Sequence, residues 1–116
     1  MTSKVGEVRV VNQHWCGDLN PYDTDTVRVP IHRGYPLGNP FKMDSPSQRD
    51  EVCDKYEDWV KGKLLQRGAE LAQFEELCSI VRGGKDLELV CFCVPKRCHG
   101  DTIKRLIEQR LDKCLP

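Results

Sequence analysis

LELVCFCVPKRCHGD, at residues 87–101, decides the fold that we predict for this chain of 116 residues. Its first half is an apolar run, which is typical of a buried strand. The run ends at Pro95, and a short polar segment then leads directly into a helical pattern. A strand that ends in a tight turn and feeds a helix is where α/β proteins place their ligands. The stretch therefore predicts an α/β fold with a site at its turn.

The segments on either side of this stretch complete the pattern. The predicted elements are strands at residues 5–12, 25–32 and 85–94, a helix that follows Ser45 or Ser47 and ends near residue 67, a helix stopped by Gly83 and Gly84, and a last helix at residues 102–114. The order β-β-α-α-β-α predicts a single α/β domain over residues 1–116, with residues 13–26 as a loop insertion. We expect two or three layers, with a Rossmann-like strand-turn-helix at the site.

Composition excludes several classes of protein. Lys and Arg balance Asp and Glu at 18 each, so the chain lacks the basic excess of proteins that coat nucleic acid. Cations of the last helix, Arg105 and Arg110 among them, are therefore expected to form a solvated surface rather than a DNA-binding one. No apolar run is long enough to cross a membrane, and the first residues lack the pattern of a signal peptide. We predict a cytoplasmic protein, in the host cytoplasm if a phage encodes it.

Cysteine is unusually frequent, with seven in the chain. An odd number without a secretion signal argues against a disulfide framework, because the cytosol keeps thiols reduced. The cysteines are then core residues, metal ligands or reactive thiols. Cys53, Cys78 and Cys114 fall among apolar residues on helical patterns, so we interpret these three as core packing.

Two loops carry chemistry that ordinary loops lack. RGYPLGNPF, at residues 33–41, combines prolines that restrict φ with glycines that permit positive φ, which indicates one specific backbone path. Such a loop can aim backbone N–H groups at an anion or a planar ligand, whereas the alternative is a structural turn that covers the core. In the loop at residues 13–26, His14, Trp15 and Cys16 form either a plug over the sheet edge or part of a site.

One interpretation of residues 87–101 is metal binding. Cys91, Cys93, Cys98 and His99 match the ligand types of a structural zinc site. Their spacing is unusual, because Cys91 and Cys93 would share one face of a strand while Cys98 and His99 are adjacent. We therefore expect no bound metal, with zinc on these four residues as the alternative.

Two further interpretations concern the turn itself. Cys98 lies near a helix N-terminus, where the dipole lowers the pKa of a thiol, and His99 and Asp101 could complete a catalytic group with it. Alternatively, the N–H groups after Gly100 hold a phosphate or another anion, with His99 adding charge. Asp101 would then cap the helix, and Cys91 would be a core residue of a central strand.

Together these residues resemble a known family, the domain of unknown function numbered 4326, found in bacteria and their phages. The resemblance covers about three quarters of the chain and departs from the family pattern in the longer loop at residues 13–26. It is carried by residues 33–34 and 36–41, by Arg49, Tyr56 and Trp59, by residues 89–93 and Pro95, and by residues 98–101.

The resemblance implies that the rigid loop and the strand-turn-helix occur together, and they form one pocket if both lie at the carboxyl ends of adjacent strands. The predicted catalytic residues are Cys98, His99 and Asp101. The predicted ligand-binding residues are Arg33, Gly34, Gly38, Asn39, Arg49 and Gly100. This set suits a nucleotide, a nucleoside or a sugar phosphate, because arginines and backbone donors hold an anion and His99 or Asp101 can move a proton.

The leading hypothesis is a small domain that binds a nucleotide-like or phosphorylated ligand in this pocket, and whether a reaction on nucleosides or nucleotides follows is left open. The alternative is a zinc-stabilised or purely structural interaction module, for example a phage factor that binds a host protein.

Overall fold

The computed structural model describes residues 5–12, 25–32, 34–41, 44–91 and 99–114, the side chains of 112–114 excepted. In chain order its elements are β1 (Val8–Asn12), β2 (Thr26–Pro30), the short 3-10 helix η1 (Pro46–Gln48), α1 (Arg49–Lys63), α2 (Ala69–Arg82), β3 (Asp86–Cys91) and α3 (His99–Cys114). This sequence of elements confirms the predicted order β-β-α-α-β-α.

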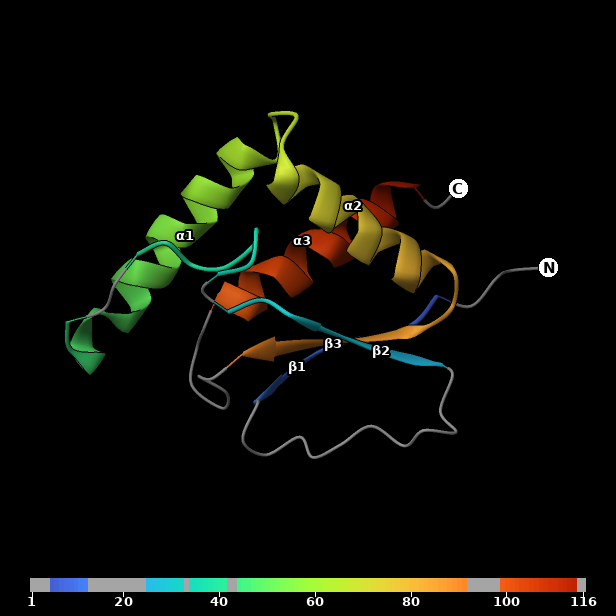
Figure 1. Ribbon diagram of the computed structural model, residues 1–116, viewed down its shortest axis with the longest axis horizontal. Helices are drawn as coiled ribbons and strands as arrows, with labels where there is room; N and C mark the ends of the chain where they lie inside the picture. The colour runs from blue at the N-terminus through green and yellow to red at the C-terminus, as the bar shows by residue number, and fades with distance from the viewer. Residues whose placement is uncertain (1–4, 13–24, 33, 42–43, 92–98, 115–116) are drawn as a thin grey trace.

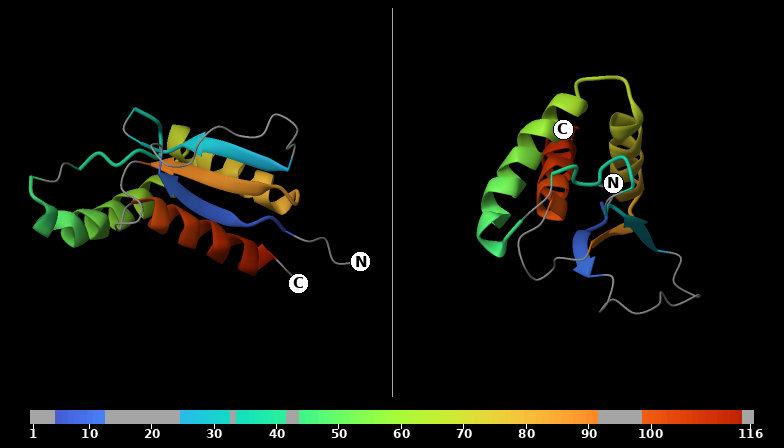
Figure 2. Two further views of the ribbon diagram at one scale, coloured as in Figure 1. Left: turned by 90° about the horizontal axis from the view of Figure 1, so that it is seen from below. Right: turned by 60° about the vertical axis from the view of Figure 1, so that its left-hand side comes forward.

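The three strands form one parallel sheet with β3 in the centre, in the order β1-β3-β2. Figure 2 shows the strands side by side from below. Because both pairings are parallel, the carboxyl ends of all three strands meet at one edge of the sheet. Asn12 pairs with Cys91 there, and Pro30 pairs with Val90. We call this edge the carboxyl edge.

All three helices lie on the same side of the sheet, so the described part of the chain forms two layers (Figure 1). Helix α2 packs against β3, α3 packs against β1 and β3, and α1 packs on α2 and α3. Of the two or three layers that we expected, the structure has two. Among the described residues, no helix is both long and apolar enough to span a membrane.

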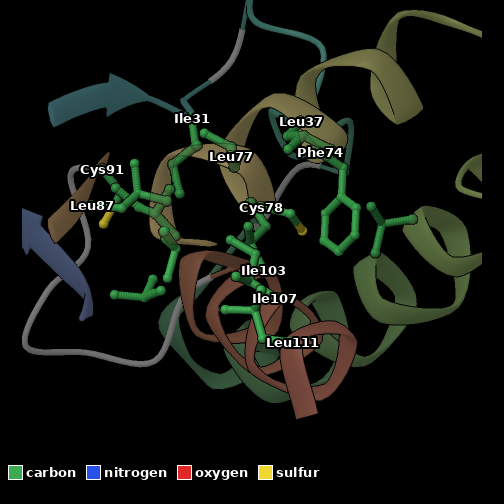
Figure 3. Packing of buried hydrophobic residues seen from close by; sticks show 14 of the residues in the cluster. Ile31, Leu37, Phe74, Leu77, Cys78, Leu87, Cys91, Ile103, Ile107 and Leu111 are labelled. Atoms are coloured by element: carbon green, nitrogen blue, oxygen red, sulfur yellow. The ribbon is translucent and has the colours of Figure 1, made fainter. Parts of the chain in front are cut away.

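The core forms where the inward faces of the helices meet the sheet (Figure 3). Alternate residues of β3 point into it, and Leu87, Leu89 and Cys91 are almost fully buried. Helix α3 contributes Ile103 and Ile107, which follow the four-residue spacing of one helix face. Together with Leu111 these residues form the inward, apolar face of α3. Cys53 and Cys78 are buried as predicted, whereas the side chain of Cys114 lies outside the described residues.

Helix boundaries differ from the prediction at two places. Helix α3 begins at His99 rather than at residue 102, so Asp101 lies in its first turn and is not the capping residue before it. Neither Ser45 nor Ser47 caps α1. Ser45 precedes η1 instead, Gln48 occupies the cap position of α1, and neither makes a capping hydrogen bond. Both differences arise at helix starts, which local sequence patterns locate less precisely than the helix itself.

Candidate functional site

The predicted site residues divide into described and undescribed ones. Arg33, Cys93 and Cys98 lie outside the described residues, as do His14, Trp15 and Cys16 of the inserted loop. The other predicted residues are described, and the geometry below concerns these.

His99 is the first residue of α3 and lies at the carboxyl edge. Its side chain is buried, with 7% of the residue exposed. The ring Nε2 lies 2.6 Å from the backbone carbonyl oxygen of Ile31, the residue after β2. A carbonyl only accepts, so Nε2 carries the hydrogen and donates it. The ring also meets Tyr56 of α1 edge-on, with ring centroids 5.1 Å apart.

The imidazole of His99 is held in its neutral form. Burial lowers the pKa of His99 because it penalises the charged ring. The hydrogen bond to Ile31 and the negative charge of Asp101 raise this pKa, and the nearby His32 lowers it, but burial has the largest effect. With hydrogen on Nε2, the lone pair is on Nδ1. His99 is therefore a hydrogen-bond acceptor at Nδ1, as a general base must be.

The loop at residues 34–41 is fastened to the helices by two hydrogen bonds at Leu37. The hydroxyl of Tyr56 donates to the Leu37 carbonyl at 2.7 Å, and the Leu37 N–H donates to Oε1 of Gln73 at 3.1 Å. Leu37 and Tyr56 are both fully buried. The contacts thus run from the loop through Tyr56 to His99, and we call His99, Ile31, Tyr56 and Leu37 the His99 junction.

Tyr56 is one of the residues that carry the family resemblance, but the predicted site does not include it. The signal was its hydroxyl, since a buried tyrosine needs a hydrogen-bond partner. Gln73 carried no comparable signal.

The loop itself has the single path that its prolines and glycines predict. Gly34 has φ +103°, which an L-residue rarely adopts. The N–H of Gly38 donates to the Tyr35 carbonyl at 2.8 Å, and the Oδ1 of Asn39 accepts from the Phe41 N–H at 2.8 Å. We expected Gly38 and Asn39 to face a ligand. Instead, the Gly38 N–H and the side-chain oxygen of Asn39 stabilise the loop.

A hollow of about 410 Å³ lies between this loop and the helices α1 and α2. Trp59 of α1 and Glu70 of α2 close it from the helices, and the loop reaches into the space between these two helices (Figure 1). The lining residues are Gly34, Tyr35, Pro36, Gly38, Asn39, Pro40, Trp59 and Glu70. We call this the loop hollow. It contains three of the predicted ligand-binding residues, Gly34, Gly38 and Asn39.

The remaining predicted residues lie elsewhere. Gly100 and the exposed Asp101 are in the first turn of α3, beside His99. Arg49 begins α1, ten residues before Trp59, which corresponds to about 15 Å along a helix axis. Arg49 is not part of the described lining of the loop hollow.

The zinc alternative is not decided by the described residues. Cys91 belongs to the hydrophobic core and is almost fully buried. Within the described ranges, no three His, Cys, Asp or Glu side chains are grouped as metal ligands. Because Cys93 and Cys98 lie outside these ranges, the four-residue set stays a prediction.

Comparisons with known proteins agree with the resemblance that the sequence motifs suggested. The model of a family described as a domain of unknown function, DUF4326, matches residues 18–109. The chain is also similar to an uncharacterised 12.4 kDa protein in the nrdA-td intergenic region of Enterobacteria phage T4. The two are 29% identical over 94 residues, which cover 81% of this chain and 79% of the phage protein. No solved structure matches the chain significantly.

Proposed function

The chain belongs to the DUF4326 family, and we propose that it binds a nucleotide-like or phosphorylated ligand at the carboxyl edge of its parallel sheet. The observation that carries the proposal is His99. It combines a buried neutral imidazole, a fixed tautomer and a position at the start of a helix.

The placement of this edge supports binding of an anion. Ligands of open α/β sheets bind outside the carboxyl ends of the strands, where helix N-termini supply backbone N–H groups. Helix α3 begins at this edge with His99, the buried Gly100 and the exposed Asp101 in its first turn. Arg33 and Arg49 are the proposed cationic partners of a phosphate.

If a reaction follows binding, His99 is the proposed general base. Its Nδ1 would accept a proton from the ligand while Ile31 keeps the ring in place. Asp101 would stabilise the imidazolium that forms, since its charge already favours the protonated ring. Cys98 is the proposed nucleophile if the reaction is covalent.

The test is a thermal-shift screen of the full chain against nucleotides, nucleosides and sugar phosphates at millimolar concentration. We expect at least one phosphorylated compound to raise the melting temperature, and Arg33→Ala to remove that shift. Arg67→Ala is the matched control, because Arg67 is exposed in the segment between α1 and α2.

His99→Ala is examined with the same compounds by calorimetry at low temperature, because this variant is expected to be less stable. No shift with any compound would overturn the proposal, and a shift that survives Arg33→Ala would overturn the assigned phosphate partner.

Elemental analysis of protein purified without chelators tests the zinc alternative in parallel: about one equivalent of zinc supports it, and its near absence removes it.

A further inference from the structure

The loop hollow is a second candidate site, and its walls restrict the chemistry of a guest. Tyr35 and Trp59 contribute aromatic rings, and Pro36 and Pro40 contribute flat apolar surface. Tyr35 is 42% exposed, and its ring meets His32 edge-on with centroids 4.9 Å apart. Flat apolar walls of this kind favour a planar guest, which stacks on them.

The charge of the lining restricts which chemical groups fit the loop hollow. Glu70 is the one charged residue of the described lining. Its carboxylate is a hydrogen-bond acceptor, so the hollow favours a guest with hydrogen-bond donors. A cationic guest is less suitable, because the ammonium of Lys63 already lies over the Trp59 ring, 5.9 Å from its centroid. The walls therefore suit a neutral, planar group that presents N–H donors to a carboxylate.

We propose that the loop hollow is the subsite for a nucleobase, with Glu70 accepting hydrogen bonds from the base edge. Guanine fits this acceptor best, because its N1–H and N2 amino group are adjacent donors that one carboxylate accepts together. In uracil the N–H lies between two carbonyl oxygens, which the carboxylate repels. This inference rests on the proposed function in that it names the base of the nucleotide-like ligand.

The direct test compares guanosine with inosine, which differs only by lacking the N2 amino group. The fluorescence of Trp59 reports binding in a Trp15→Phe background, because the chain contains two tryptophans. We expect guanosine to quench Trp59 and to bind about ten-fold more tightly than inosine. Glu70→Gln should remove this preference, because the amide offers one acceptor and one donor in place of two acceptors.

Two variants complete the design. Glu76→Gln, an exposed glutamate on the same helix, is the matched control and should leave the preference unchanged. Tyr35→Ala removes one exposed wall and should weaken guanosine about ten-fold, since stacking of one base on an aromatic ring has that order of effect. Equal binding of guanosine and inosine, or a preference that survives Glu70→Gln, would overturn the proposal.

The outcome is distinguishable from failure of the proposed function. Phosphorylated compounds could raise the melting temperature equally whatever their base, and equally in the Glu70→Gln variant. That result would support the proposed function and contradict the base subsite. If guanosine binds through Glu70 but no phosphate adds affinity, the base subsite stands and the phosphate site at α3 falls. If no nucleoside quenches Trp59, the base subsite is wrong.

Discussion

Two polar clusters on the same sheet differ in almost every physical respect. The His99 junction lies at the carboxyl edge and consists of neutral hydrogen bonds in the core. The second cluster, which we call the charged row, consists of Arg9, Glu88 and Arg28, which lie side by side across β1, β3 and β2. Glu88 lies 2.7 Å from Arg28 and 3.5 Å from Arg9.

Burial is what separates the two clusters energetically. The charged row is open to solvent mainly at Arg9, whose side chain is 41% exposed, whereas those of Arg28 and Glu88 are 20% and 14% exposed. Water competes for the charge of Arg9 and salt screens it. Around the His99 junction, little water can replace a lost partner, and each buried carbonyl must be satisfied from within the protein. Formal charge is therefore a poor guide to which cluster matters more for stability.

Replacing the imidazole is expected to have the largest effect. His99→Ala leaves a cavity and removes the donor to the Ile31 carbonyl, so we expect unfolding to become easier by about 2–4 kcal/mol. Urea denaturation followed by circular dichroism measures this. His32→Ala, at a half-buried position near the same edge, should cost about 1 kcal/mol or less. Similar losses for the two histidines would show that the junction has no special role.

Removal of the Tyr56 hydroxyl is expected to have the second largest effect on stability. Tyr56→Phe keeps the ring but leaves the buried Leu37 carbonyl without its donor, which costs about 1–2 kcal/mol. Tyr35→Phe makes the same chemical change on an exposed ring and should have almost no effect. An unchanged urea midpoint for Tyr56→Phe would mean that water satisfies the Leu37 carbonyl after all.

A pH dependence should follow from the lowered pKa of His99. At pH values between the lowered pKa and the ordinary value of about 6.5, His99 is protonated in the unfolded chain but neutral in the folded one. Stability is therefore complete above about pH 6.5 and falls as the pH decreases through this window. Urea midpoints between pH 7.5 and 5.5 measure the effect, which His99→Gln should abolish and His32→Gln should leave in place. Stability that rises on acidification would contradict the assigned neutral form.

Substitution in the charged row should change the free energy of unfolding least. Glu88→Gln removes the charge that both arginines share, and we expect a loss of about 0.5–1 kcal/mol that shrinks at high salt. Glu51→Gln, in an exposed pair with Lys55 on α1, is the control and should be nearly neutral. A loss for Glu88→Gln that exceeds the loss for Tyr56→Phe would reverse the comparison between the two clusters.

The loop at residues 34–41 shows where prediction from sequence succeeds and fails. Its prolines and glycines predicted a single backbone path, and the positive φ of Gly34 agrees with this. Which loop atoms face a ligand was not predictable, because the Gly38 amide and the Asn39 oxygen bind neighbouring backbone in the folded loop. The loop hollow was also not predictable, since Trp59 and Glu70 come from two different helices.

Local pattern was sufficient for the element order and for the placement of Cys53 and Cys78 in the core. The four-residue recurrence of Ile103 and Ile107 and the alternation of Leu87 and Leu89 arise from the geometry of a single helix or strand, so the sequence determined them by itself. The start of α3, the strand order and the neutral state of His99 were decided by the tertiary structure. Each depends on segments that are distant in the sequence. Burial among those segments favours the neutral ring of His99, and the bond to Ile31 across 68 residues fixes its position, which no local period encodes.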